Sequence, residues 1–116
     1  LQAKKSGFDK FIKKQVDKGV IYTGSSAGSM ITGPDIAITW RPENEPYAKS
    51  LTNTLGFNLV DFLIFPHWGN LHFEKIFFSH RLKNAYKKGN KTILLNDDQY
   101  VEVKDNHYQI VDITKE

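Results

Sequence analysis

The sequence of 116 residues contains no cysteine, four prolines and no long hydrophobic run. The absence of cysteine excludes a disulfide framework, a thiolate metal site and a thiol nucleophile, and it agrees with a reducing compartment. A nucleophile in this chain is therefore expected to be an oxygen. The apolar runs at residues 62–65 and 76–78 are too short to span a membrane, and the first residues lack the apolar core of a secretion signal. We therefore expect a cytoplasmic protein with no membrane partner.

The charge is nearly balanced, with 16 Lys and Arg residues against 13 Asp and Glu residues and a net charge of +3. The lysines form scattered pairs rather than a stripe, and no groove-reading motif accompanies them. Solvated helix faces explain these pairs, so we expect no nucleic-acid partner. A content of 40% hydrophobic residues in a chain of this length indicates one globular domain.

Hydrophobic periodicity predicts an alternation of helices and strands. Apolar residues at helical spacing favour amphipathic helices over residues 7–18 and 72–87, and a short helix over 27–31. A surface loop is expected over residues 41–50, and a hairpin turn over 104–106. The segments expected to be extended are residues 20–22, 36–40, 59–65, 92–95, 100–103 and 108–113. This βαβ pattern predicts an α/β fold with a mostly parallel sheet and a C-terminal β-hairpin.

One motif carries chemistry: residues 24–28 read G-x-S-x-G between an expected buried strand and an expected helix. That context is the one a nucleophile elbow needs, because the glycines allow a sharp turn that projects the central Ser26 hydroxyl above the sheet. The backbone N–H of Ala27 and the helix N-terminus then face a developing oxyanion. A phosphate-binding loop at a helix N-terminus is the alternative for this pentapeptide.

A serine nucleophile needs a base, and His67 follows the next buried strand. The carboxyl ends of parallel strands meet at one edge of a sheet, so Ser26 and His67 are expected on the same edge. The order of serine, acid and histidine also occurs in α/β-hydrolases, but the interval between Ser26 and His67 is too short for that fold. Glu43, Glu45 and Asp35 are the candidates for the acid that orients His67.

A metal site formed by His67, His72 and His80 is an alternative to this interpretation. The spacings of His67, His72 and His80 do not match a compact helical ligand pair, and no cysteine completes a ligand set. We expect no metal and no other cofactor.

Three blocks of the sequence carry a resemblance to a known family: residues 22–29, residues 33–36, and the apolar run from Leu59 into Phe65-Pro66-His67-Trp68-Gly69-Asn70. Together they resemble the dipeptidase E family of serine peptidases, which also includes cyanophycinases. The resemblance implies a flavodoxin-like, three-layer αβα sandwich shared with class I glutamine amidotransferases. The implied activity is hydrolysis of short peptides, above all dipeptides with an N-terminal aspartate, through an acyl-enzyme.

The resemblance also implies roles for single residues. Ser26 is the implied nucleophile and His67 the implied base, and the position of Glu43 holds the orienting acid, usually as Asp, with Glu45 as its rival. Arg81 is the implied partner of the substrate's acidic side chain. Trp68 and Asn70, which follow His67, are further candidates for substrate binding.

The family's first strands and a second oxyanion donor lie upstream of anything in these 116 residues. We therefore expect residues 1–116 to form the C-terminal part of a peptidase domain of about twice the length. Three alternatives stay open: another acidic or isopeptide substrate, as in cyanophycinases, a catalytically inactive relative that acts as a binding module, and a homodimer in place of a monomer.

Overall fold

The computed structural model describes residues 1–39, 41, 46 and 49–114. The chain begins with two short helices, α1 (Gln2–Ser6) and α2 (Phe8–Asp17), which Gly7 separates with a φ of 75°. The helix predicted over residues 7–18 is thus confirmed. In the described ranges, no helix is both long enough and apolar enough to cross a membrane.

A parallel pair of strands forms the centre of the fold. β1 (Leu63–Phe65) pairs with β2 (Thr92–Leu94), with Ile64 opposite Ile93. The connection between them is one long helical segment made of α5 (Leu71–Ile76), a π-helical turn η3 (Phe77–Arg81) and α6 (Leu82–Lys87). This unit confirms the predicted α/β fold with a parallel sheet and the helix predicted over 72–87.

The side chains of β1 alternate between two hydrophobic clusters, as the period of a strand requires. Leu63 and Phe65 pack with Phe77 and with other residues of the helical segment, and the Phe65 and Phe77 side chains are both only 1% exposed. Ile64 points the other way and joins a second cluster with Phe62, Ile93 and Leu95. The parallel pair is therefore covered on both faces.

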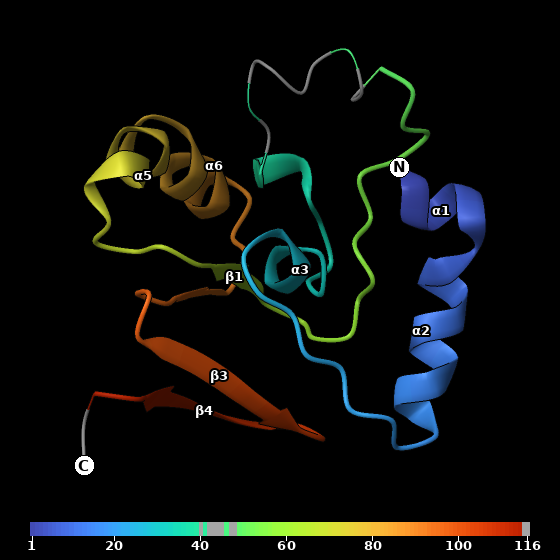
Figure 1. Ribbon diagram of the computed structural model, residues 1–116. Helices are drawn as coiled ribbons and strands as arrows, with labels where there is room; N and C mark the ends of the chain where they lie inside the picture. The colour runs from blue at the N-terminus through green and yellow to red at the C-terminus, as the bar shows by residue number, and fades with distance from the viewer. Residues whose placement is uncertain (40, 42–45, 47–48, 115–116) are drawn as a thin grey trace.

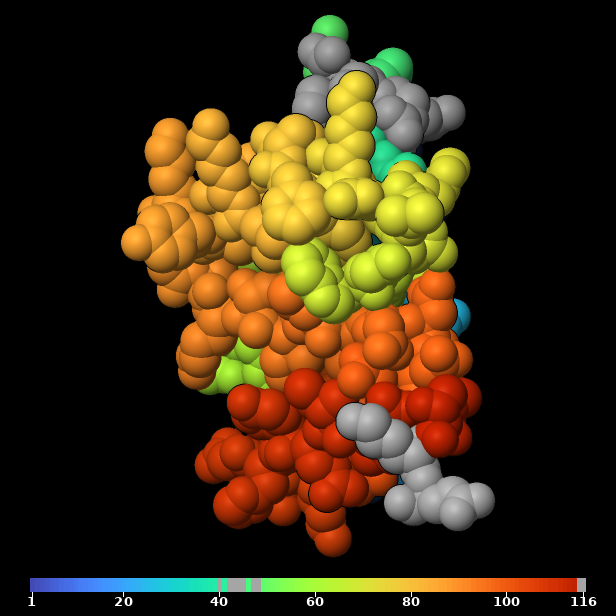
Figure 2. Space-filling view, turned by 90° about the vertical axis from the view of Figure 1, so that its left-hand side faces the viewer, coloured from blue at the N-terminus to red at the C-terminus, as the bar shows by residue number. Residues whose placement is uncertain are grey.

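The second cluster faces a C-terminal hairpin of β3 (Gln99–Lys104) and β4 (His107–Asp112), which pair antiparallel. The ring of Phe62 lies 5.4 Å from the ring of Tyr108 on β4. Figure 1 shows α5 and α6 on one side of β1 and the hairpin on the other. Figure 2 shows the same order of layers from the side, with the yellow and orange helical segment above the red hairpin.

Two extended predictions were wrong. Residues 20–22 form no strand, because in the described part of the chain no strand lies beside them to complete a ladder, and Ile21 stays 86% exposed. Within residues 36–40 the structure has a 3₁₀ turn, η1 (Ala37–Thr39), because the Asp35 side chain accepts a hydrogen bond from the Ala37 N–H at 2.8 Å. The short helix predicted at 27–31 is present as α3 (Ala27–Met30).

Candidate active site

The turn that leads into α3 holds Ser26 in a conformation rare for a residue with a side chain. Its φ is 47° and its ψ is −120°. The Ser26 carbonyl oxygen accepts hydrogen bonds from the N–H groups of Ser29, at 3.0 Å, and Met30, at 3.1 Å. The Ser29 hydroxyl donates a third bond to the same oxygen at 2.6 Å. These hydrogen bonds fix the Ser26 backbone to the first turn of α3, and Ser26 itself is exposed.

Close backbone packing makes this turn possible. A Cβ atom on Gly24 would lie 2.5 Å from the Gly28 carbonyl oxygen, so any larger residue would push the turn open. The Tyr22 hydroxyl donates to the same carbonyl oxygen at 2.8 Å. Burial raises the pKa of that hydroxyl, which therefore stays protonated as a donor. The close approach of Gly24 to Gly28 and the hydrogen bond from Tyr22 hold the two ends of the predicted elbow together.

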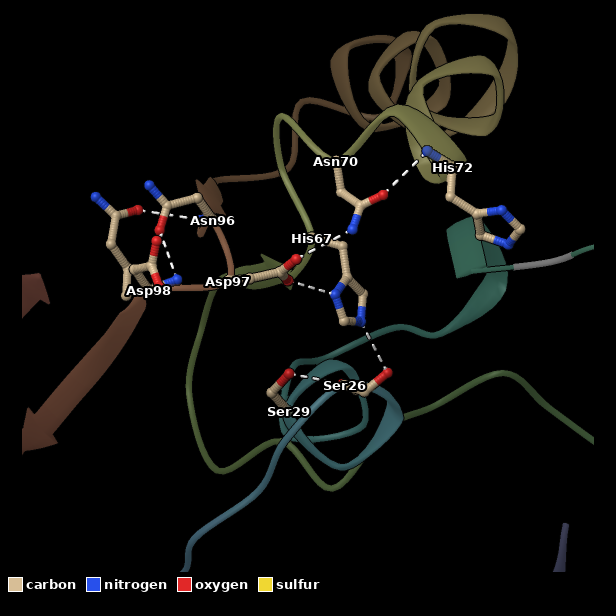
Figure 3. Close-up of polar contacts among 9 residues, drawn as sticks. Ser26, Ser29, His67, Asn70, His72, Asn96, Asp97 and Asp98 are labelled. Carbon is tan, nitrogen blue, oxygen red and sulfur yellow. Dashed lines mark hydrogen bonds and ion pairs between the residues drawn. The ribbon is translucent and has the colours of Figure 1, made fainter. Parts of the chain in front are cut away.

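His67 lies just beyond the end of β1, where the sequence placed it. Its backbone also has a positive φ, of 69°. The imidazole stacks on the ring of Phe73, with centroids 4.4 Å apart and planes 11° from parallel. In this position its Nε2 atom lies 3.1 Å from the Ser26 hydroxyl oxygen (Figure 3). The structure therefore brings Ser26 and His67 together.

The other nitrogen of His67 contacts a residue that the sequence analysis missed. Nδ1 lies 2.6 Å from Oδ1 of Asp97, which follows β2. Oδ2 of Asp97 accepts a hydrogen bond from the Asn70 side-chain amide at 3.1 Å. The hydrogen bond from Asn70, followed by that from His67, holds the pKa of the Asp97 carboxyl below its ordinary value. Asp97 is therefore a carboxylate at neutral pH.

An ionised Asp97 determines which nitrogen of His67 carries the proton. A carboxylate only accepts hydrogen bonds, so Nδ1 of His67 must be the protonated nitrogen. Nε2 is then free to accept the hydrogen bond of the Ser26 hydroxyl. The contacts from Asp97 through His67 to Ser26 thus have the donor and acceptor order that a base-activated hydroxyl needs.

Ala27 is the first residue of α3, so its backbone N–H has no acceptor within the helix. An N–H at this position and the positive end of the helix favour a negative charge that develops beside Ser26. Ala27 directly follows Ser26 at the start of α3, and its role as oxyanion donor remains a prediction.

Of the acids predicted from the sequence, Asp35 is described by the structure, and it contacts groups other than His67. Glu43 and Glu45 lie outside the described residues, so the prediction that one of them orients His67 stays a prediction. Asp35 accepts from the Ala37 N–H and pairs with Lys88 at 3.3 Å instead.

Arg81 is buried in the helical segment and not solvent-facing, with only 3% of the residue exposed. Its guanidinium carbon lies 5.5 Å from the centroid of the Phe77 ring, and its buried Nε atom has no hydrogen-bond partner among the described residues. Burial, and after it the positive charge of Arg41, lowers the pKa of Arg81. In the described part of the chain no carboxylate pairs with Arg81, and a buried cation without such a partner costs free energy unless a ligand compensates it.

The remaining candidates have contacts within the protein. Trp68 packs against Phe77, with ring centroids 5.6 Å apart, and against Phe78 at 5.9 Å. Asn70 contacts Asp97 as described above. Within the described ranges, no group of three or more His, Asp or Glu side chains is placed to hold a metal ion.

Asp97 was missed although the sequence contains a signal for it. Asn96-Asp97-Asp98 directly follow a predicted strand, and the carboxyl ends of neighbouring parallel strands meet at one edge of the sheet. The same rule located His67. The predicted acids all lie between Ser26 and His67 in the sequence, whereas the pairing of β1 with β2 brings the later loop to the site.

Comparison with known proteins places these residues in context. The model of peptidase family S51 matches residues 1–111. The uncharacterized peptidase Lin0382 of Listeria innocua is 35% identical over 104 residues, which cover 90% of this chain and 49% of that protein. The uncharacterized peptidase Lmo0363 of Listeria monocytogenes is 40% identical over 75 residues, which cover 65% of this chain and 37% of that protein.

A solved structure has the same fold. It is the crystal structure of a protein from Listeria monocytogenes EGD-e that carries the name peptidase E, with a TM-score of 0.77 and 26% sequence identity. The match covers 95% of this chain and 52% of that one. The chain therefore spans about half of the length of these relatives, or less.

Proposed function

Because the chain belongs to peptidase family S51, we propose that it acts as a serine peptidase with Ser26 as nucleophile, His67 as base and Asp97 as orienting acid. The observation that carries the proposal is the continuous set of contacts from Asp97 to Nδ1 of His67, at 2.6 Å, and from Nε2 to the Ser26 hydroxyl, at 3.1 Å. Both distances are within the range over which a proton is shared or transferred.

The proposed reaction proceeds through an acyl-enzyme. The Ser26 oxygen bonds to the peptide carbonyl carbon while its proton passes to Nε2 of His67, and the carbonyl oxygen becomes an oxyanion beside the Ala27 N–H. The carbon–nitrogen bond then breaks as His67 returns the proton to the leaving amine. Water, activated by His67 in the same way, releases the acid product and restores the Ser26 hydroxyl. Asp97 stabilises the imidazolium in both halves of the reaction.

Arg81 is the residue proposed to bind an acidic side chain of the substrate. A guanidinium binds a carboxylate through two parallel hydrogen bonds, and the Nε–H of the buried Arg81 has no partner among the residues that the structure describes. The substrate class proposed is therefore short peptides with an N-terminal aspartate. A cyanophycinase-like preference for another acidic or isopeptide-linked substrate has the same requirement for Arg81.

Hydrolysis of a chromogenic aspartyl amide by the intact protein tests this proposal. We expect turnover by the wild type and by Ser25→Ala, whose altered side chain is next to the nucleophile. Ser26→Ala should lower kcat by a factor of about 10⁴ or more, with an unchanged circular dichroism spectrum. Slower turnover of the matching alanyl amide would support the role given to Arg81. Activity that survives in Ser26→Ala would rule out the mechanism.

A further inference from the structure

Asn70 is the residue that connects Asp97 to the start of α5. Its side-chain oxygen accepts a hydrogen bond from the His72 backbone N–H at 3.0 Å, which caps the helix. Its side-chain NH₂ donates to Oδ2 of Asp97 at 3.1 Å (Figure 3). A backbone N–H can only donate, so the oxygen of the amide must face His72. The NH₂ group is therefore directed at Asp97 by the chemistry of its partners.

The backbone fixes the position of Asn70 relative to His67. The Asn70 N–H donates to the His67 carbonyl oxygen at 3.1 Å, across a turn in which Gly69 has a φ of 81°. The Asn70 carbonyl oxygen then accepts from the Phe73 N–H at 3.0 Å. Phe73 is also the residue on which the His67 ring stacks. Asn70 thus belongs to the same short segment that holds His67 in place.

Asp97 needs such support, because its side chain is 52% exposed and lies in the loop after β2. In the described part of the chain, one oxygen of its carboxylate contacts His67 and the other contacts Asn70. Two contacts on opposite oxygens fix the plane of a carboxylate, whereas one contact leaves it free to rotate. A solvated carboxylate that rotates would lose its alignment with Nδ1 of His67.

We propose that Asn70 is a positioning residue that holds Asp97 against His67. This inference rests on the proposed function, since it concerns the acid of the same site. It assigns Asn70 a role different from the substrate contact that the family resemblance implies. The lowered pKa of Asp97 agrees with it, because the hydrogen bond from Asn70 is the largest contribution that favours the carboxylate.

Two substitutions separate this role from helix capping. Asn70→Ser keeps an oxygen that caps the helix but is too short to reach Asp97. Asn70→Asp also keeps the capping oxygen, but it turns a carboxylate oxygen toward Asp97 where the NH₂ was. The matched control is Asn53→Asp. Like Asn70, Asn53 accepts a hydrogen bond from the backbone N–H two residues later, that of Leu55 at 3.1 Å. Its side chain otherwise contacts Lys4 and not Asp97.

Nuclear magnetic resonance titration of the purified protein is the first measurement, because it needs no turnover. We expect the pKa of the Asp97 carboxyl to rise in Asn70→Ser, and to rise further in Asn70→Asp because two carboxylates then face each other. The proton signal of His67 Nδ1 should weaken in both variants, and Asn53→Asp should match the wild type. An unchanged Asp97 pKa and an unchanged His67 signal in a folded Asn70→Ser variant would overturn the proposal.

Kinetics then distinguishes positioning from substrate binding. With the aspartyl amide, Asn70→Ser should lower kcat about tenfold, equivalent to about 1.4 kcal/mol, with KM nearly unchanged. A raised KM with an unchanged kcat would overturn the proposal in favour of a substrate contact. If the wild type hydrolyses no amide, the proposed function fails, and the titration still decides whether Asn70 positions Asp97.

Discussion

At the scale of single residues, Ser26 and His67 both have positive φ values, 47° and 69°. Residues with side chains avoid this region, at a cost of about 1–3 kcal/mol each. Three hydrogen bonds to the Ser26 carbonyl oxygen and the stacking of His67 on Phe73 offset this cost. These strained backbone conformations direct the Ser26 hydroxyl toward Nε2 of His67. Relaxed conformations of the two residues would not guarantee this contact.

The first prediction concerns the acid. In Asp97→Asn, the Asn70 NH₂ attracts the oxygen of the new amide, so the new NH₂ group faces Nδ1 of His67. That nitrogen must then accept a hydrogen bond, and the proton moves to Nε2, where it blocks the reaction. We expect kcat for the aspartyl amide to fall by a factor of about 10⁴.

Glu43→Gln is the matched comparison for Asp97→Asn, since it removes the charge of the acid that the family resemblance implies. If Asp97 orients His67, steady-state kinetics of Glu43→Gln should stay within about threefold of the wild type. The opposite result, with Glu43→Gln inactive and Asp97→Asn active, would assign the role to Glu43.

The sequence was sufficient to predict the meeting of Ser26 and His67, because each depends on a local signal at the end of a predicted strand. Asp97 was not predicted, since its place depends on which strand pairs with β1 and in which register. The burial of Arg81 also could not be predicted from the sequence. It depends on η3, a π-helical turn that changes which face of the helix the residue occupies.

At the scale of elements, the elbow depends on the close approach of residues 24 and 28. A methyl group on Gly24 would lie 2.5 Å from the Gly28 carbonyl oxygen, whereas a methyl group on Gly28 meets nothing nearer than the Tyr22 hydroxyl at 3.8 Å. The two glycines of the motif therefore differ in their tolerance of a larger side chain, although they look equivalent in the sequence.

The second prediction follows from this difference. Gly24→Ala should lower the free energy of unfolding by about 1–3 kcal/mol and displace Ser26. Gly28→Ala lies within α3 and should leave stability within about 0.5 kcal/mol of the wild type or raise it slightly. Urea unfolding of both variants measures the effect, and equal stabilities would contradict the packing described for the elbow.

The third prediction concerns Asp35, which anchors η1 to α6. Burial alone would raise its pKa, but hydrogen bonds from the Ala37 N–H and Thr54 and the pairing with Lys88 lower it overall. A folded-state pKa below the ordinary value of 3.8 means that ionised Asp35 stabilises the fold above about pH 4. This contribution is lost as the pH falls through the folded-state pKa.

Unfolding by urea at about pH 7 and about pH 3 checks this sign. At neutral pH the free energy of unfolding of the wild type should be higher than that of Asp35→Asn, by less than about 1 kcal/mol, because Lys88 is partly exposed. The difference should shrink at acid pH. A difference that grows with acidity would contradict the assigned pairing.

The helices and the hairpin strands were predictable because their hydrophobic periodicity is local. The segment at residues 20–22 has the apolar character of a buried strand, yet a strand also needs a partner, and Val20 and Ile21 are 49% and 86% exposed. Similarly, η1 replaces an expected extended segment because a single side chain, that of Asp35, caps the turn.

At the scale of the whole molecule, large apolar side chains remain on the surface of the N-terminal region. Phe8 and Phe11 on α2 are 42% and 55% exposed, and their rings lie 6.2 Å apart. Exposed apolar surface of this kind favours contact with another polypeptide surface. Self-association as a homodimer is the alternative use of this surface and stays a prediction.

Covalent labelling tests whether Ser26 is a nucleophile that His67 activates. We would treat the intact protein with a fluorophosphonate probe and locate the adduct by mass spectrometry of its peptides. We expect one adduct, on Ser26, that forms far more slowly in Asp97→Asn. Absence of an adduct, or an adduct on a serine other than Ser26, would contradict this role of Ser26.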